Sequence, residues 1–214
     1  NSRRQDNILP SQRRTKQKYP LATMVRRETT GVVLVGAGQS TRMGGVDKIF
    51  ASLGDMPLLL HSLNRFHAHP DIDYISLVLG SDSVDRGREI VRYNNLHKVC
   101  SVTTGGPRRQ DSVRIGLSKL SACSLILVHD VARPLIESAL ISRGLEAVLV
   151  TGVATPVLPI TDTMKSVDPS GHLEPGIVDR SMFKLVQTPQ VFRRNILERA
   201  HNEIQQTVTD DTAM

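Results

Sequence analysis

The sequence predicts an α/β fold, in which a mostly parallel sheet carries helices on both faces and a β-hairpin arm projects from the domain. Hydrophobic residues make up 39% of the chain but aromatic residues only 3%, and tryptophan is absent. The core must therefore be built from Val, Leu, Ile and Ala, which favours parallel strands covered by helices. Short apolar runs also alternate with stretches of helical spacing, as parallel strands joined by crossover helices require. One segment, residues 160–182, interrupts this alternation with turn residues.

Five apolar runs predict strands, and the stretches between and after them predict helices. The expected strands are residues 31–36, 74–80, 98–106, 124–130 and 152–159. The expected helices are residues 57–69, 83–94, 109–120, 137–150 and 193–206. In the first helix Pro57 suits the first turn, and the apolar side chains that share one face are Leu59, Leu60, Leu63 and Phe66. Because ligands of such sheets bind at the carboxyl ends of strands, functional residues are expected in the loops that directly follow strands.

Residues 160–182 are expected to form the projecting arm. Turn-forming sequences occur twice in this segment, at residues 168–171 and at Pro175-Gly176, and their flanks contain Thr, Val and Ile. A two-stranded hairpin cannot bury its apolar side chains by itself. Such an arm commonly packs against a second copy of the chain, so the sequence predicts a homodimer.

The net charge of +6 lies in the N-terminal segment. Residues 1–30 contain eight Lys and Arg side chains against Asp6 and Glu28, whereas residues 31–214 contain 19 basic and 19 acidic side chains. The folded part therefore carries no excess positive charge, which argues against a nucleic-acid-binding domain. Residues 1–30 are polar and lack a hydrophobic period, so we expect a disordered basic tail followed by one domain over residues 31–214.

Composition also bears on the location of the protein. No apolar run reaches the roughly 18 residues that a membrane span requires, so no membrane partner is expected. Cys100 and Cys123 stand apart without a Cys-X-X-Cys motif, as is usual in a reducing compartment. We expect a bacterial cytoplasmic protein that begins at Met24. The alternative is that the tail is a transit peptide and the protein is plastidic.

A glycine-rich loop, "GAGQSTRMGGVDK" at residues 36–48, follows the first predicted strand. It is not a dinucleotide-binding fingerprint, because Thr41 replaces the third glycine, and it is not a P-loop, because Lys48 follows Asp47. The backbone N–H groups of residues 37–40 can surround phosphate oxygens. Arg42 and Lys48 add positive charge that could neutralise a triphosphate.

The loops after the third and fourth predicted strands carry complementary chemistry. Gly106 permits close backbone approach, and Arg109 and Ser112 follow it. Asp130 offers an oxygen ligand for Mg²⁺, and Arg133 suits bidentate phosphate binding. Two groups of cations thus flank one carboxylate, and each group could bind a phosphate. This arrangement is suited to a reaction that joins two phosphates.

Some of these residues also have structural interpretations. Asp130 could cap the helix that follows it. His129 could serve only as a structural hydrogen-bonding residue. Arg180, in the predicted arm, could be solvated. The combination at the ends of the first, third and fourth predicted strands favours a functional site.

Six motifs occur in an order that is specific for one family. They are GAGQSTRMGGVDK, GGPRRQDSV, VHDVARP, DTMK, VDR and TPQVF. Over residues 31–212 the chain resembles the 2-C-methyl-D-erythritol 4-phosphate cytidylyltransferases of the non-mevalonate isoprenoid pathway. The resemblance implies a Rossmann-like nucleotidyltransferase fold, a homodimer with interlocked arms, and the use of CTP with Mg²⁺. In the implied reaction the phosphate of a polyol phosphate attacks the α-phosphorus of CTP and pyrophosphate leaves.

The resemblance also implies roles for individual residues. The nucleotide-binding residues are Gly36, Ala37, Gly38, Gly106, Arg109, Ser112 and Ala132. The catalytic residues are Arg42, Lys48, Asp130 and Arg180; Asp130 also binds the metal, and Arg180 reaches in from the partner subunit. The substrate-binding residues are Arg133, Thr163, Thr188 and Thr209.

The chain departs from the family pattern at three points. Ser40 stands where a glycine is usual. Pro107 replaces an often acidic residue and cannot donate a backbone N–H, so contacts to the base are expected to be weaker there. The sequence stops at Met214, before the segment that carries the family's second active-site lysine.

These departures leave alternatives open. The first is the same chemistry on ribitol 5-phosphate or another polyol phosphate. The second is a CTP-binding protein without turnover. A Rossmann oxidoreductase is disfavoured by Thr41. Asp55 does stand about 20 residues after the first glycine of the loop, where such enzymes carry an acidic residue, but the adjacent Gly54 indicates a turn.

Overall fold

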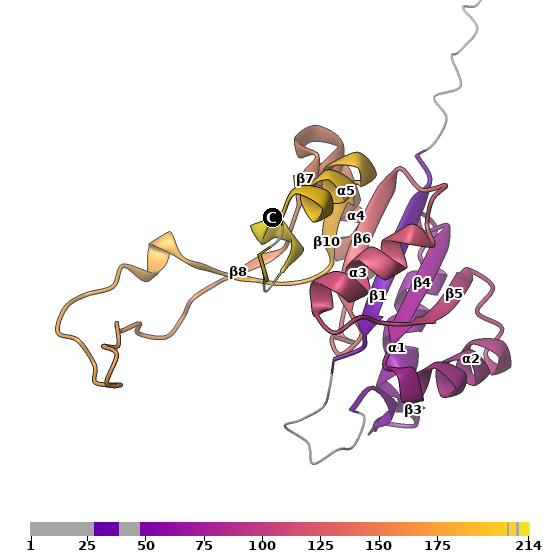
Figure 1. Ribbon diagram of the computed structural model, residues 1–214, viewed down its shortest axis with the longest axis horizontal. Helices are drawn as coiled ribbons and strands as arrows, with labels where there is room; N and C mark the ends of the chain where they lie inside the picture. The colour runs from indigo at the N-terminus through magenta and orange to yellow at the C-terminus, as the bar shows by residue number, and fades with distance from the viewer. Residues whose placement is uncertain (1–27, 39–47, 205, 209) are drawn as a thin grey trace, which may run out of the picture.

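The computed structural model describes residues 28–38, 48–204, 206–208 and 210–214. Its centre is a six-stranded sheet with the order β5-β4-β1-β6-β10-β7 (Figure 1). The strands are β1 (Thr30–Gly36), β4 (Tyr74–Leu79), β5 (Val99–Thr104), β6 (Leu125–Asp130), β7 (Val153–Ala154) and β10 (Gln190–Arg193). β5, β4, β1 and β6 pair in parallel, whereas β10 pairs antiparallel with both β6 and β7. The predicted α/β class with a mostly parallel sheet is confirmed.

Helices cover both faces of this sheet. They are α1 (Leu58–Ala68), α2 (Val84–Tyr93), α3 (Arg109–Ser118), α4 (Ser138–Thr151) and α5 (Arg194–Glu203). Side chains of α1, α2 and α4 pack in one apolar core, and those of α3 and α5 in a second one. Val32 and Leu34 of β1 join the first core, and the alternate residues Val33 and Val35 join the second. The apolar residues predicted to share a face of the first helix are all buried.

The helix starts differ slightly from the predictions. Pro57 precedes α1 instead of opening it, and it ends the short strand β3 (Met56–Pro57), which pairs with β2 (Ser52–Leu53). Gly54 has a φ of 66° in the turn between these two strands, so the predicted turn is present. Ser83 precedes α2, but its side chain makes no capping hydrogen bond. In the part of the chain that the structure describes, no helix has the length and hydropathy needed to cross a membrane.

The prediction of a single strand over residues 152–159 is wrong. The segment divides at Thr155 and Pro156 into β7, which lies at the edge of the main sheet, and β8 (Val157–Pro159), which pairs with β9 (Lys184–Val186) outside it. Pro156 and Pro159 have no backbone N–H and cannot donate to a sheet ladder. The position beside β6 is taken by β10 instead.

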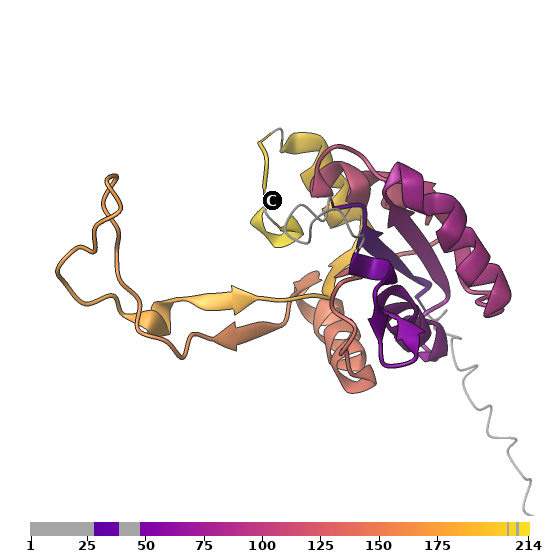
Figure 2. The same ribbon diagram turned by 90° about the horizontal axis from the view of Figure 1, so that it is seen from below.

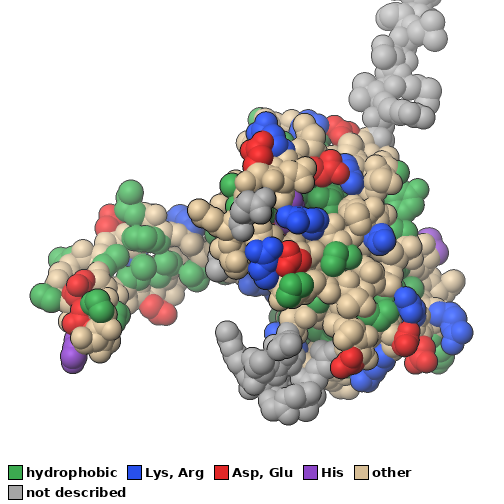
Figure 3. Space-filling model, viewed as in Figure 1, with side chains coloured by type: hydrophobic (Ala, Val, Ile, Leu, Met, Phe, Trp, Pro, Cys, Tyr) green, Lys and Arg blue, Asp and Glu red, His purple; other side chains and the backbone are tan. Residues whose placement is uncertain are grey.

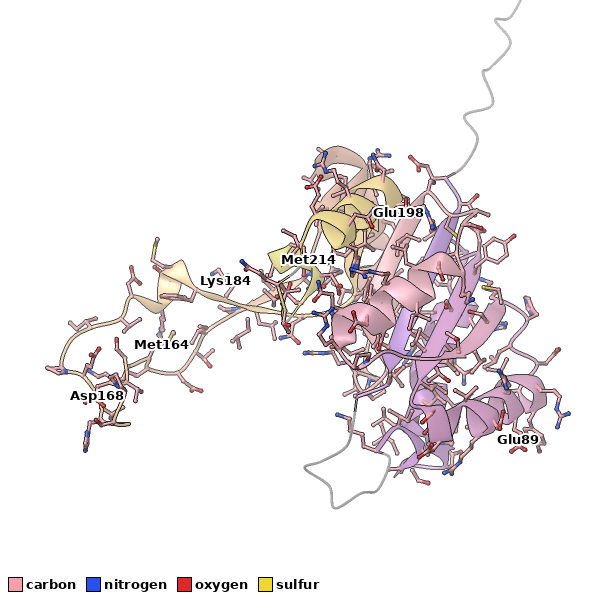
Figure 4. All side chains as sticks on the ribbon, in the orientation of Figure 1. Glu89, Met164, Asp168, Lys184, Glu198 and Met214 are labelled. Carbon is pink, nitrogen blue, oxygen red and sulfur yellow. The ribbon has the colours of Figure 1, made fainter. Side chains whose placement is uncertain are left out.

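The arm predicted for residues 160–182 is present and is longer than expected. Its stem is the β8–β9 pair, so the arm begins at Val157 and ends at Val186. Figures 1 and 2 show it extending away from the body of the molecule. At the far end, Asp168 Oδ1 accepts hydrogen bonds from the backbone N–H groups of Ser170 (2.8 Å) and His172 (2.9 Å), as the turn residues predict. Figure 4 shows Asp168 at this distal end and Lys184 on the stem.

Candidate active site

Three loops at the carboxyl edge of the sheet surround a cavity of about 750 Å³. The loops follow β1, β5 and β6, whose carboxyl ends meet at this edge because the strands are parallel. The predicted site residues that line the cavity are Gly36, Ala37, Gly38, Lys48, Gly106, Arg109, Ser112, Asp130, Ala132 and Arg133. The fold thus brings residues from three separate loops into one hollow.

The loops after β1 and β5 approach each other closely at Gly105. A Cβ atom on Gly105 would lie 2.4 Å from the Cβ of Ala37 and 2.6 Å from the Oγ of Ser112. Ser112 Oγ also accepts a hydrogen bond from the N–H of Gly106 at 3.2 Å. Any larger residue at position 105 would push the two loops apart and widen the cavity.

Lys48 is presented to the cavity by the short 3-10 helix η2 (Lys48–Phe50). Ile49 and Phe50 are buried. The guanidinium of Arg86, on α2, lies 4.3 Å from the centre of the Phe50 ring. Core packing and this cation–π contact fix the backbone at Lys48, so its charge is held beside the cavity.

Asp130 ends β6 and lies between two arginines. Its Oδ1 accepts a hydrogen bond from Arg109 Nε at 3.1 Å, and its Oδ2 accepts one from Arg133 Nε at 3.2 Å. Arg109 also pairs with the buried carboxylate of Asp211 at 2.5 Å, and Arg133 donates to the Oε1 of Gln187. The alternative that Asp130 caps a helix is wrong, since Glu137 takes the N-cap position of α4.

The cavity lining carries more positive than negative charge. Burial by itself lowers the pKa of the Arg109 guanidinium, but Asp211 and Asp130 more than offset this, and the pKa is raised above its ordinary value. Lys48, Arg108 and Arg133 also line the cavity, where Asp130 is the one acidic residue among the lining residues described. A ligand with several phosphate groups matches this charge.

Other predicted site residues lie elsewhere. Thr188 does not line the cavity; it is buried behind the loop that follows β6, with its Oγ1 2.9 Å from His129 Nδ1. Thr163 and Arg180 lie on the arm, where Arg180 donates to the carbonyl of Thr161. Arg42 and Thr209, like Ser40 and Thr41, lie outside the residues that the structure describes.

The sequence did not single out Arg108, Gln187 or Asp211. Arg108 lines the cavity and pairs with Asp111 at 2.7 Å, and its place beside Arg109 was the available signal. Gln187 and Asp211 reach the site from segments that are distant in the sequence; Asp211 lies 102 residues from its partner Arg109. No local pattern indicates a contact of that kind.

The oxygen ligands that the described side chains offer fit Mg²⁺ only if a bound nucleotide supplies further ligands. In the described part of the chain no group of three or more His, Cys, Asp and Glu side chains is placed to hold a metal. Asp130 would supply one carboxylate. Mg²⁺ in nucleotide enzymes is commonly held by one or two carboxylates together with substrate phosphates. The residues therefore fit a metal ion that arrives with a nucleotide, and not a metal held by protein ligands alone.

Comparison with known proteins decides the family. The family model described as 2-C-methyl-D-erythritol 4-phosphate cytidylyltransferase matches residues 30–214. This chain belongs to the 2-C-methyl-D-erythritol 4-phosphate cytidylyltransferase family. A cytidylyltransferase of this name from Dehalococcoides mccartyi strain 195 is 42% identical over 191 residues, covering 89% of this chain and 84% of the relative. One from Clostridium tetani is 34% identical, covering 89% and 82%.

Solved structures of cytidylyltransferases share the fold. The 2-C-methyl-D-erythritol 4-phosphate cytidylyltransferase from Thermus thermophilus superposes with a TM-score of 0.67 at 31% identity, covering 87% of this chain and 82% of that chain. The 4-diphosphocytidyl-2C-methyl-D-erythritol synthase from Anaerococcus prevotii gives a TM-score of 0.73 at 23% identity, covering 86% and 80%. The cytidylyltransferase fold therefore holds for nearly the whole described chain.

Proposed function

We propose that this chain transfers the cytidylyl group of CTP to 2-C-methyl-D-erythritol 4-phosphate, a step of non-mevalonate isoprenoid biosynthesis. The observation that carries the proposal is the cavity in which one carboxylate, Asp130, lies between cations from three loops. Family membership and the relatives named above support the same substrate pair. The products are the CDP-alcohol and pyrophosphate.

In this reaction the protein mainly positions the phosphate groups and neutralises their charge. An oxygen of the substrate phosphate forms a bond to the α-phosphorus of CTP, and the bond from that phosphorus to the pyrophosphate oxygen breaks. The backbone of residues 36–38, which lines the cavity, would hold the triphosphate, and Lys48 would neutralise the charge that develops on it. Arg133 would orient the attacking phosphate.

Mg²⁺ belongs to this proposal as a cofactor. Asp130 would hold the ion from the protein side, with the remaining ligands coming from phosphate oxygens and water. When bound, the ion would neutralise charge on the phosphates. Asp130 already has one arginine on each carboxylate oxygen, so these side chains would share it with the metal.

A homodimer joined through the arm is also part of the proposal. The arm exposes large apolar side chains that its own chain does not cover, among them Leu173 (70% exposed), Ile177 (98%) and Met182 (78%). Figure 3 shows such side chains gathered along the arm. A second copy of the chain would bury them. Thr163 and Arg180, which lie away from their own cavity, would then act at the partner's site.

The direct test is pyrophosphate release by the full chain with CTP and Mg²⁺. We expect release with 2-C-methyl-D-erythritol 4-phosphate and little with ribitol 5-phosphate. Lys48→Ala should lower kcat/KM by roughly 100- to 1000-fold, because a charge that stabilises the transition state is lost. Lys119→Ala is the matched control, since Lys119 is an exposed lysine that does not line the cavity.

The other outcomes separate the alternatives. Release with ribitol 5-phosphate alone would reassign the substrate. Absence of release with either polyol phosphate, together with a melting temperature that CTP raises, would indicate a nucleotide-binding protein without turnover and would overturn the proposal.

A further inference from the structure

His129 lies beneath the cavity and has no role in the chemistry described above. It is the residue before Asp130 in β6 and is completely buried. Its ring packs against Phe66 of α1, with the ring centres 5.0 Å apart. Both ring nitrogens are within hydrogen-bonding distance of polar atoms: Nδ1 is 2.9 Å from Thr188 Oγ1, and Nε2 is 3.0 Å from the carbonyl oxygen of Arg133.

The chemistry of these partners fixes the direction of each hydrogen bond. A carbonyl oxygen only accepts, so Nε2 of His129 carries the proton and donates it to Arg133. A neutral imidazole carries a single N–H, which here is on Nε2. In a neutral ring Nδ1 accepts, so the hydroxyl of Thr188 donates to it. Thr188 Oγ1 can then accept from the N–H of Asp130, at 3.4 Å.

This chain of hydrogen bonds holds the loop that carries the cavity's charged residues. The N–H of Val131 donates to the carbonyl of Val35 on β1 (3.0 Å), and within the loop the N–H of Arg133 donates to the carbonyl of Asp130 (3.0 Å). Ser62 Oγ donates to the carbonyl of Val131 at 2.7 Å. At the far end of the loop, the carbonyl of Arg133 accepts a hydrogen bond from the ring of His129.

The partner of His129 belongs to the segment in which the chain returns from the arm. Thr188 lies between the stem strand β9 and β10, and its neighbour Gln187 contacts the side chain of Arg133. The N–H of Gln187 donates to the carbonyl of Pro156 at 2.9 Å, and Thr155 Oγ1 donates to the carbonyl of Gln187 at 3.3 Å. The loop is therefore tied to a return segment that is itself clamped to the start of the arm.

We propose that His129 is a positioning residue for cytidylyl transfer, whose ring ties residues 130–133 to Thr188 and so sets the places of Asp130 and Arg133. The expected effect on kcat rests on the proposed function. The expected effect on the position of residues 130–133 rests on the hydrogen bonds alone. The ring is not among the residues that line the cavity. Its effect reaches the reaction through the loop.

His129→Asn is the variant that tests this. Asparagine keeps an acceptor near the Nδ1 position but loses the donor to Arg133. We expect kcat to fall by roughly 10- to 100-fold, because small displacements of charged groups slow such reactions, with little change in the KM for CTP. His129→Gln, whose longer side chain can donate to Arg133, should recover most of the lost kcat.

His69→Asn is the matched control. His69 is also buried, and both of its ring nitrogens have partners: Nδ1 accepts from the N–H of Asp71, and Nε2 lies 3.2 Å from Ser142 Oγ. It does not line the catalytic cavity. We expect His69→Asn to lose stability to a similar extent and to keep the wild-type kcat. Equal kcat in His129→Asn and His69→Asn would overturn the proposal.

A second measurement is independent of turnover. In NMR spectra of the wild-type chain the ring proton of His129 should be on Nε2, and His129→Asn should shift the amide signals of residues 131–133 whereas His69→Asn should not. A proton on Nδ1, or unshifted amides in His129→Asn, would contradict the positioning role. If the wild-type chain released no pyrophosphate, the proposed function would be wrong. The NMR spectra would still show whether His129 positions residues 131–133.

Discussion

At the scale of single residues, the site is organised by an alternating row of charges. Arg133, Asp130, Arg109 and Asp211 follow one another, each in contact with the next. Asp211 is almost fully buried, so this end of the row is shielded from water, whereas Arg133 at the other end is half exposed. Neutralising Arg109 would leave the buried carboxylate of Asp211 without its arginine partner, which is costly.

His129 makes stability depend on pH. Its pKa is about 4 in the folded chain, below the value of about 6.5 for an exposed histidine. Between these values the unfolded chain binds more protons, so the free energy of unfolding falls as the pH drops from 7 to 4, by about 3 kcal/mol from this residue. Urea unfolding at several pH values should show this loss in the wild type. His129→Asn should lack the part of this loss that comes from His129. An equal loss of unfolding free energy with falling pH in the two chains would contradict the lowered pKa of His129.

Many of the site residues could be predicted from the sequence, because glycines, arginines and an aspartate follow the first, third and fourth predicted strands. The contacts between these residues could not. Arg109 was expected to bind the nucleotide and does line the cavity, but its bonds to Asp130 and Asp211 were not expected. Thr188 was expected to bind substrate, but it faces His129. A side chain's partner depends on tertiary packing, which local sequence does not contain.

At the scale of elements, the approach of α3 to the sheet determines where Arg109 and Ser112 lie, since both are in its first turns. Gly116, one turn further, faces β1 and β4. A Cβ atom there would lie 2.4 Å from Cγ1 of Val33 and 2.9 Å from Cγ2 of Val78. Because these valines are fully buried, the helix cannot accept a larger residue without moving outward.

Gly116→Ala should therefore be destabilising although alanine is the better helix former. We expect a loss of roughly 1–3 kcal/mol in the free energy of unfolding, since the added methyl group overpacks the core. Thermal or urea unfolding measures it. Ser118→Ala, at an exposed position of the same helix, is the control and should change little. A stabilised Gly116→Ala would show that α3 lies further from the sheet than described.

Among the elements, the long strands and helices were predictable because their apolar periods are regular. The edge of the sheet was not. β7 spans only Val153–Ala154, and β10 spans Gln190–Arg193, too short to show a distinctive period. The insertion of β10 between β6 and β7 joins segments far apart in the sequence. Strand order of this kind follows from packing across the whole sheet.

At the scale of the whole molecule, the proposed exchange of arms makes each site depend on two chains. A mixed dimer of one Lys48→Ala chain and one Arg180→Ala chain would contain one doubly altered site and one intact site. We expect the purified mixed dimer to have about half the wild-type rate of pyrophosphate release, whereas each single-variant dimer is nearly inactive. If Arg180 acts within its own chain, neither site is intact, and the mixed dimer would be as inactive as the parents.

The arm was predictable because turn residues replaced the alternating pattern, but its length was not. Sequence alone placed the start at residue 160, after the apolar run, whereas the structure begins the stem at Val157. Pairing between β8 and β9 decides this boundary, and the partners of that pairing are separated by the whole arm.

The ends of the arm meet. Pro156 and Gln187 are joined by a backbone hydrogen bond, so the chain leaves the body and re-enters it at almost the same place. The length and sequence of the arm can therefore change in evolution without shifting the register of the sheet. The cavity, in contrast, is built into the sheet's own loops. Under the proposed exchange of arms, the contacts of Thr163 and Arg180 to the second substrate would lie on a piece of chain separate from the nucleotide cavity, whereas the contact of Arg133 would stay within that cavity.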